Sequence, residues 1–225
     1  MKILVVDTTS EICGVGILED NKLIIETALN NGLTHSENLI LLIKDNLEKA
    51  KINLSEIDLL VCCTGPGSFT GIRIGIASIK AIAEVNNLKI AEVTSLESLA
   101  QNIKNISETK VSLIDARNNQ CYCGIFDNNI NLKENYIADD INVILERVSK
   151  YDNITFIGNG AELHKKLIIS KIKNANFDNN NIQSPYACGI IGLKKFKEKK
   201  LKDADTLLPN YLRKSQAERL KNKGN

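Results

Sequence analysis

Residues 57–75 read IDLLVCCTGPGSFTGIRIG and hold an apolar run, a glycine-rich turn and the beginning of a helical pattern. The run 57–63 is typical of a buried strand. After the turn, apolar side chains recur at one-face helical spacing, at Ile72, Ile76, Ile79 and Ala83. A strand that passes through such a turn into a helix is one unit of an α/β fold.

The residues before this segment predict three short strands and a helix. Apolar runs at 2–6 and 12–18, with a third beginning at 23–25, are separated by short turns. Thr34 and Glu37 have the spacing of a capping box, which predicts a helix through about residue 50. A strand at 90–93 and a helix from Ser95 complete the order βββαβαβα.

The second half of the chain predicts the same order of elements. Apolar runs predict strands at 111–115, 121–126, 130–137 and 154–157, with helices at 139–150, 161–170 and 185–200. Two matches support a duplication: Asp7 and Asp115 are each followed nine residues later by a glycine, at 16 and 124, and the pair Gly65 and Gly67 matches Gly158 and Gly160. A duplicated βββαβα unit is the plan of the two-lobed actin-like fold, which is RNase H-like and shared with sugar kinases and Hsp70. We expect lobes at 1–108 and 109–225, the second with a basic helix and tail.

Composition excludes several classes of protein. The 225 residues include 29 Lys plus Arg and 27 Asp plus Glu, and 43% are hydrophobic, as in an ordinary folded protein that is not a dedicated nucleic-acid binder. The longest stretch free of charged residues and histidine, 179–193, is shorter than the ~20 apolar residues of a membrane span. The amino terminus lacks a secretory apolar segment, so we expect a cytoplasmic protein. Six cysteines without C-x-x-C spacing predict neither a zinc ribbon nor disulfides.

The turn at 65–71 is the first candidate for chemistry. Backbone N–H groups at a helix start can hold an anion, although the spacing fits neither the dinucleotide fingerprint nor the P-loop. Actin-like proteins place a phosphate hairpin and a metal-directed carboxylate at the end of the first strand, where this chain has Asp7-Thr8-Thr9. The expected vestigial nucleotide or anion site is Asp7, Thr8, Thr9, Gly65, Gly67, Ser68 and Arg73. The alternative is that the glycines serve only a close crossing of strand and helix.

The corresponding turn of the second half reads Asp115-Ala116-Arg117. Arg117 stands where a glycine is expected if a phosphate is to approach the backbone. One half of a nucleotide clamp is therefore expected without the other. No cofactor is expected, and weak residual binding of ATP and Mg²⁺ stays open.

The helix at 35–50 indicates a partner. Residues 39–43 are all apolar and at 100° per residue cover the whole circumference, so one face can pack on the sheet while the other needs a cover. The helix from Ile72 carries small residues that let another helix approach. The predicted interface is His35, Leu39, Leu42, Ile43, Leu47, Ile72, Gly75, Ile76 and Ile79. Complete burial within one subunit is the alternative.

The two histidines and the basic residues near the end of the chain support only less specific predictions. His35-x-Glu37 lacks the P-C-x-x-C that a zinc deaminase needs, and a lone imidazole is a poor metal site. We expect no metal site, and an exposed His164. The basic residues from Lys194 to Lys202 are either a solvated helix end or a contact for RNA phosphate.

Several motifs together resemble a known family. They are TGPGSFTGIRIG at 64–75, Asp7-Thr8-Thr9, His35-Ser36-Glu37, Ser95-Leu96-Glu97, Asp115-Ala116-Arg117 and Pro209-Asn210-Tyr211-Leu212-Arg213. The chain resembles the bacterial TsaB family over almost its full length. The resemblance implies a non-catalytic subunit of the machinery that installs threonylcarbamoyladenosine in tRNA beside the anticodon. It implies pairing with the catalytic paralogue TsaD, a further ATPase partner, TsaE, a homodimer when the chain is alone, and tRNA reached through the complex.

One departure from the catalytic paralogue agrees with this interpretation. The resemblance implies that the paralogue binds its metal with H-x-E-x-H on the first helix, whereas here Leu39 takes the place of the second histidine. Three hypotheses remain: a scaffold subunit, an ATP-dependent transferase or kinase of the actin-like class, and a peptidase. The peptidase hypothesis lacks a metal pair or a nucleophile constellation.

Overall fold

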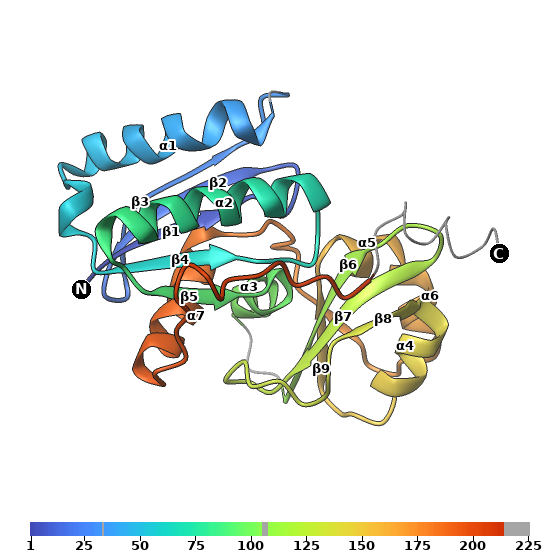
Figure 1. Ribbon diagram of the computed structural model, residues 1–225. Coiled ribbons are helices and arrows are strands. Elements are labelled where there is room, and N and C mark those ends of the chain that lie inside the picture. Colours follow the sequence, from blue (N-terminus) through green and yellow to red (C-terminus); the bar gives the residue numbers. More distant parts are fainter. Residues whose placement is uncertain (33, 105–107, 214–225) are drawn as a thin grey trace.

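The computed structural model describes residues 1–32, 34–104 and 108–213. These residues form two lobes, each built on a five-stranded sheet (Figure 1). The first lobe holds β1 (Lys2–Asp7), β2 (Cys13–Glu19), β3 (Lys22–Leu29), α1 (His35–Ala50), a 3₁₀ turn (Leu54–Glu56), β4 (Leu59–Cys63), α2 (Phe69–Asn86), β5 (Ile90–Val93) and α3 (Ser95–Asn102). The remaining elements are β6 (Thr109–Asp115), β7 (Gln120–Phe126), β8 (Ile137–Asp140), α4 (Ile141–Val148), β9 (Ile154–Ile157), α5 (Asn159–Leu163), α6 (Lys165–Lys171), β10 (Asn176–Phe177) and α7 (Pro185–Lys197).

The two sheets have the same topology, which confirms the predicted duplication. The first has the order β3-β2-β1-β4-β5 and the second, read the same way, β8-β7-β6-β9-β10. In each, the first strand is antiparallel to the second and parallel to the fourth. Gly65 after β4 and Gly158 after β9 both have positive φ, 106° and 105°. The sequence match of these two glycines therefore marks equivalent positions.

The other match does not mark equivalent positions. Gly16 pairs with Val5, two residues before Asp7, whereas Gly124 pairs with Ser112, three residues before Asp115. The turn between β6 and β7 is one residue shorter than the turn between β1 and β2. A shift of one residue moves a side chain to the other face of the sheet, so the two glycines are not counterparts.

The central strands β1 and β4 of the first sheet are buried on both faces. In β1, Leu4 and Val6 point to the core under α1 and α2, whereas Ile3 and Val5 point to a second core on the opposite face. Successive side chains of a strand alternate between faces, and a strand covered on both sides is apolar throughout. This explains the uninterrupted apolar runs of β1 and β4.

Helix α7 covers the second face of the first sheet, although the sequence places it after the second lobe. Cβ atoms added at Gly189 and Gly192 would lie 2.8 Å from Leu18 and 2.4 Å from Val61, so only glycine lets α7 lie this close. Helix α3 in turn packs on the second sheet, where the Ser112 hydroxyl donates to the Leu96 carbonyl at 2.7 Å. Each lobe thus contributes one helix to the other: α3 packs on the second sheet and α7 on the first. The lobe expected at 109–225 therefore includes α7, which packs on the first sheet.

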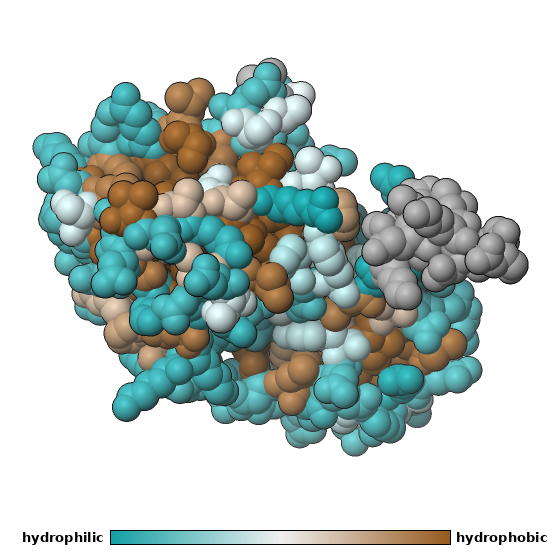
Figure 2. Space-filling model, in the orientation of Figure 1, coloured by the Kyte–Doolittle hydropathy of each residue, from teal (hydrophilic) through white to brown (hydrophobic). Residues whose placement is uncertain are grey.

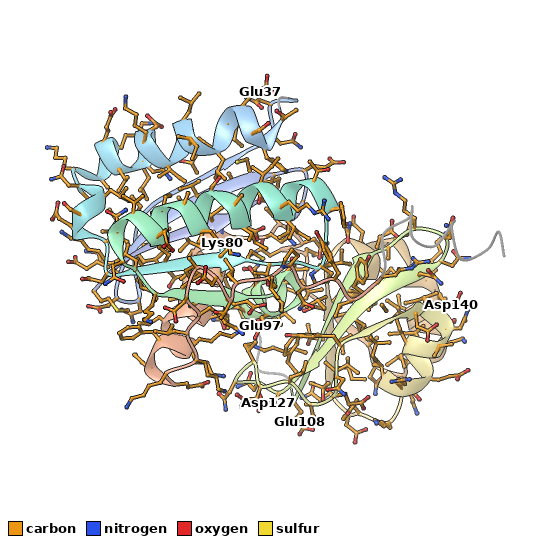
Figure 3. The ribbon with its side chains drawn as sticks, in the orientation of Figure 1. Glu37, Lys80, Glu97, Glu108, Asp127 and Asp140 are labelled. Carbon is orange, nitrogen blue, oxygen red and sulfur yellow. The ribbon has the colours of Figure 1, made fainter. Side chains whose placement is uncertain are left out.

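Polar contacts join the lobes around α3. Glu97 of α3, which is labelled in Figure 3, forms an ion pair with Lys195 of α7 at 2.8 Å. The hydroxyls of Thr94 and Tyr136 lie 3.0 Å apart. Burial and the nearby Glu97 carboxylate raise the pKa of Tyr136, so it stays a neutral hydroxyl.

The segment after α7 returns across the first lobe to the second (Figure 1). Lys202 exchanges two backbone hydrogen bonds with Ile90, and the Asn210 N–H donates to the Thr64 carbonyl at 2.9 Å. Leu207 is fully buried in the core under α1 and α2. The segment 201–213 is therefore a fixed strap.

Three local predictions were wrong: the strand at 130–137, the continuous helix at 161–170 and the exposure of His164. The strand expected at 130–137 lies at 137–140, because Asp127 accepts hydrogen bonds from the N–H groups of Asn129 and Asn131 and closes a turn there. The helix expected at 161–170 is split at His164, which is half-buried. All six cysteines are buried and carry free thiols. No described helix is long and apolar enough to cross a membrane.

Candidate functional site

The polar side chains of the turn after β1 form hydrogen bonds with one another and with neighbouring residues of the fold. One carboxylate oxygen of Asp7 accepts hydrogen bonds from the Thr9 N–H at 2.9 Å and the Thr9 hydroxyl at 2.7 Å. The Thr8 hydroxyl donates to the Gly71 carbonyl at 2.7 Å. Ser95 of α3 donates its hydroxyl to the Thr9 hydroxyl oxygen at 3.0 Å. Both threonine hydroxyls are thus engaged inside the fold.

The glycine-rich turn packs directly against these residues. The Ser68 N–H donates to the Thr9 carbonyl at 2.7 Å. A Cβ atom at Gly67 would lie 2.0 Å from the Thr9 carbonyl oxygen, and one at Gly71 would lie 2.0 Å from that of Thr8. The structure therefore brings most of the predicted anion-site residues together, but as a close crossing of two backbones. This geometry is the alternative stated for these glycines.

Arg73 is held by two aromatic side chains. Its guanidinium carbon lies 3.9 Å from the ring centroid of Phe69, and its Nε–H donates to the Tyr211 hydroxyl at 2.9 Å. The two rings stack with centroids 4.8 Å apart. The arginine is held between the first turn of α2 and the C-terminal strap.

Asp7 is the most perturbed carboxyl near the turn. Its second oxygen is buried and has no hydrogen-bond partner among the described residues. Burial raises its pKa, and the hydrogen bonds from Thr9 oppose that shift without cancelling it. A raised pKa makes the charged form of this carboxyl, which a metal-bound water would need, less favourable than in an exposed aspartate.

The residues His35 and Glu37 have structural roles at the start of α1. The His35 Nε2–H donates to the Ser10 carbonyl at 2.8 Å, and Glu37 completes the capping box with Thr34 that the sequence predicts. Hydrogen bonds from Thr34 lower the pKa of Glu37. Within the described residues, no three His, Cys, Asp or Glu side chains are grouped to hold a metal ion.

Most of the predicted interface residues lie largely in the core of the first lobe. Leu39, Leu42, Ile43, Ile72, Gly75, Ile76 and Ile79 are buried between the first sheet and the two helices, and only His35 and Leu47 are partly exposed. The sequence leaves the rotation of each helix undetermined, so it did not show that these seven residues face the core; their part in an interface stays a prediction. The buried face of α1 is the one that contains Leu39, Leu42 and Ile43.

The solvent-exposed surface of α1 and α2 also carries apolar side chains. Ile40 and Leu41 of α1 are 56% and 67% exposed, and Val85 of α2 is 85% exposed. Figure 2 shows apolar residues gathered over the region of α1 and α2. The sequence signal for Ile40 and Leu41 was the unbroken apolar run, which contains more residues than one buried face can hold.

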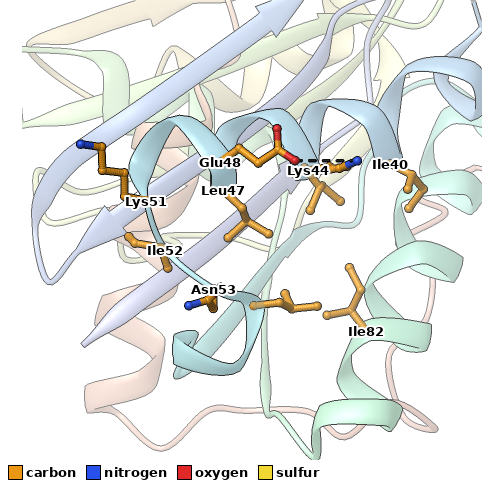
Figure 4. A pocket seen from close by; sticks show the side chains of 10 residues that line it. Ile40, Lys44, Leu47, Glu48, Lys51, Ile52, Asn53 and Ile82 are labelled. Atoms are coloured by element: carbon orange, nitrogen blue, oxygen red, sulfur yellow. Dashed lines mark ion pairs between the residues drawn. The ribbon is translucent and has the colours of Figure 1, made fainter.

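A groove lies at one end of this surface (Figure 4). Its volume is about 590 Å³, and apolar side chains of both helices and of the following turn line it: Ile40, Ile43, Leu47, Ile52, Leu54 and Ile82. Lys44 and Glu48 form an ion pair at 3.7 Å on its rim. We call the exposed side chains Ile40 and Leu41, together with the partly exposed Leu47 and Ile82, the α1–α2 face.

In the second lobe, the turn after β6 repeats that after β1. The Arg117 N–H donates to the Asp115 carboxylate at 2.9 Å, as Thr9 does to Asp7. Arg117 has a φ of 64°, the left-handed region that favours glycine. The position at which a glycine was expected is therefore glycine-like in conformation but carries an exposed arginine.

The duplicated strand order, the exchanged helices and the paired aspartate turns place the chain in the actin-like class of two-lobed α/β proteins. A family model described as TsaD, tRNA N6-adenosine threonylcarbamoyltransferase, matches residues 32–221. The tRNA threonylcarbamoyladenosine biosynthesis protein TsaB of Bacillus subtilis is 30% identical over 226 residues, which cover 97% of this chain and 96% of that protein. The Escherichia coli protein of the same name is 32% identical over 124 residues, 54% of this chain and 53% of that protein.

A solved structure agrees with the fold. YeaZ from Pseudomonas aeruginosa has a TM-score of 0.80 at 23% identity, with 94% of this chain and 99% of that chain covered. The likeness to the Bacillus subtilis protein over nearly all of both chains shows that the chain belongs to the TsaB family.

Proposed function

We propose that the chain is a non-catalytic subunit in tRNA threonylcarbamoyladenosine biosynthesis that binds a catalytic paralogue of the TsaD type through its α1–α2 face. Relatives along its whole length are named for that pathway. The observation that carries the proposal is the exposed apolar surface on α1 and α2, beside a groove between the helices. Such a surface on a folded domain marks an interaction site.

The proposed partner follows from the shared fold. Because a TsaD family model matches this chain over residues 32–221, the paralogue has corresponding first-lobe helices. Two proteins of one fold can pair equivalent helices around a pseudo-twofold axis, and two copies of this chain can do so around a true one. The homodimer of the isolated chain is proposed on the same grounds.

A non-catalytic role agrees with the turns that carry the chemistry in actin-like enzymes. The Thr8 and Thr9 hydroxyls are engaged internally, and Gly67 is in contact with the Thr9 backbone. Burial raises the pKa of Asp7. These contacts disfavour the alternative of an ATP-dependent transferase or kinase, because that reaction needs the same groups for phosphate and Mg²⁺.

The proposal is tested by size-exclusion chromatography with light scattering on the chain, alone and mixed with the same organism's TsaD-type protein. Burying a leucine side chain contributes about 1.5–3 kcal/mol, and Leu41 is two-thirds exposed, so Leu41→Asp is expected to weaken pairing at least about tenfold. Leu163→Asp is the matched control, since Leu163 is 63% exposed on α5 of the other lobe. A wild-type chain that stays monomeric and ignores the paralogue would refute the proposal.

The ATPase partner of the TsaE type and access to tRNA through the complex belong to the same proposal. They are tested by adding the ATPase to the purified pair and measuring whether a ternary complex elutes. The chromatography of the chain with the TsaD-type protein is carried out first, because ATPase binding and access to tRNA both require that heterodimer.

A further inference from the structure

A continuous set of contacts leads from α2 across the strap to the second lobe. Arg73 lies over Phe69 and donates to the Tyr211 hydroxyl. Two residues further along the strap, Arg213 reaches the Ala116 carbonyl at 3.5 Å. Ala116 precedes the exposed Arg117. We call Arg73, Arg117 and Arg213 the arginine band.

The cations of the band lack acidic partners. None of the three arginines forms an ion pair with a carboxylate within the described residues, where the observed pairs all use lysines or the amino terminus. Helix α2 begins beside the band, and its first turn holds no acidic residue. The positive end of an 18-residue helix adds to the same field. The surface therefore attracts anions.

The guanidinium of Arg73 has free hydrogen-bond donors and a fixed plane, which suit a phosphate. Only its Nε–H is used, in the hydrogen bond to Tyr211, so the four N–H bonds of the two terminal nitrogens are free to donate among the described residues. Stacking on Phe69 fixes the plane of the guanidinium and reduces the side-chain entropy lost on binding. A planar, immobilised fork matches two phosphate oxygens.

The stacked rings of Phe69 and Tyr211 are exposed beside these arginines. Phe69 and Tyr211 are 38% and 40% exposed although they stack on each other. Exposed rings beside arginines are typical of surfaces that bind single-stranded nucleic acid, where bases stack and cations contact the backbone. A protein partner with an acidic surface would use the cations without needing the rings.

We propose that the arginine band, with Phe69 and Tyr211, contacts the phosphate backbone and an unstacked base of the tRNA substrate. The identity of the RNA rests on the proposed function, whereas the RNA chemistry rests on the band itself. Arg213 of the strap contacts the second lobe at Ala116, and Figure 1 shows the strap passing from the first lobe to the second.

The basic end of α7 is a weaker candidate for the same role. Lys194 donates to the Asn129 carbonyl and the Asn131 side chain, both at 2.8 Å. Lys195 is paired with Glu97. Two of its lysines thus fasten α7 to neighbouring segments.

The test is fluorescence anisotropy with a labelled tRNA transcript, on the chain alone and on its complex with the TsaD-type paralogue, across a range of salt concentrations. The variants are Arg73→Gln, Arg213→Gln and Arg117→Asn, the last chosen because asparagine tolerates a positive φ. Lys166→Gln on the exposed side of α6 is the control for lost charge. Arg73→Lys keeps the charge but loses the planar fork.

Each arginine variant is expected to bind tRNA roughly three- to tenfold more weakly and to reduce the salt slope by about one, with no change for Lys166→Gln. Arg73→Lys is expected to recover only part of the loss. Unchanged tRNA binding in all three variants would overturn the proposal. So would normal tRNA binding with loss of the ATPase partner, since the band would then be a protein interface. Elution of the heterodimer, measured separately, reports on the proposed function and is expected to be unaffected by these variants.

Discussion

Replacing Gly71 with alanine tests the close crossing of the β1 turn and α2. Gly71 lies in the first turn of α2 with its Cα against the Thr8 backbone, and the Thr8 hydroxyl donates to its carbonyl at 2.7 Å. The change adds one methyl group. Two opposing effects on the free energy of unfolding follow, and the structure indicates which one is larger.

Helix propensity alone favours the variant, because alanine is better than glycine in a helix by about 1 kcal/mol. The added Cβ would lie 2.0 Å from the Thr8 carbonyl oxygen, a backbone atom that cannot rotate away, and 2.9 Å from the His35 ring. Separating the two backbones costs about 1–3 kcal/mol for overpacking and about 1 kcal/mol for the lost hydrogen bond. The net expectation is a loss of roughly 1–3 kcal/mol.

Urea denaturation of the isolated chain measures this loss, and thermal melting should show a decrease of roughly 2–4 °C per kcal/mol for a chain of this size. The control is Ala77→Gly on the exposed face of the same helix, which reverses the chemical change without any contact and should cost about 1 kcal/mol. If Gly71→Ala were as stable as the wild type or more so, the close crossing would not be a rigid feature of the fold. The turn would then have room for a ligand after all.

Two further predictions concern the buried residues. Ile43→Ala is expected to lower the free energy of unfolding of the isolated chain by about 2–5 kcal/mol, because Ile43 is only 5% exposed; a residue that served mainly an interface would show no loss in urea without a partner. Asp7→Asn is expected to stabilise the chain at pH 7 but not near pH 4. The raised pKa of Asp7 means that the wild type loses stability as pH rises above the unfolded value of about 4 through the folded value, whereas asparagine does not titrate; an equal gain at both pH values in thermal melts would contradict this.

Local patterns determined much of this protein. The capping box of Thr34 and Glu37 is present at the start of α1, and the face of α2 that contains Ile72, Ile76 and Ile79 is buried. These features depend on contacts within a few residues or on one helical period, so the sequence alone predicts them. The duplicated order of strands and helices was predicted in the same way.

Long-range packing decided the rest. The sequence showed that α1 has more apolar residues than one face can bury, but only the packing on β2 and β3 determined that Leu39 is covered and Leu41 exposed. Likewise, Arg73 is four residues from Phe69, but its hydrogen-bond partner Tyr211 is 138 positions away in the sequence. Periodicity defines the residues that share a face. The orientation of that face, and the distant segment that meets it, depend on the docking of whole elements, which no local pattern specifies.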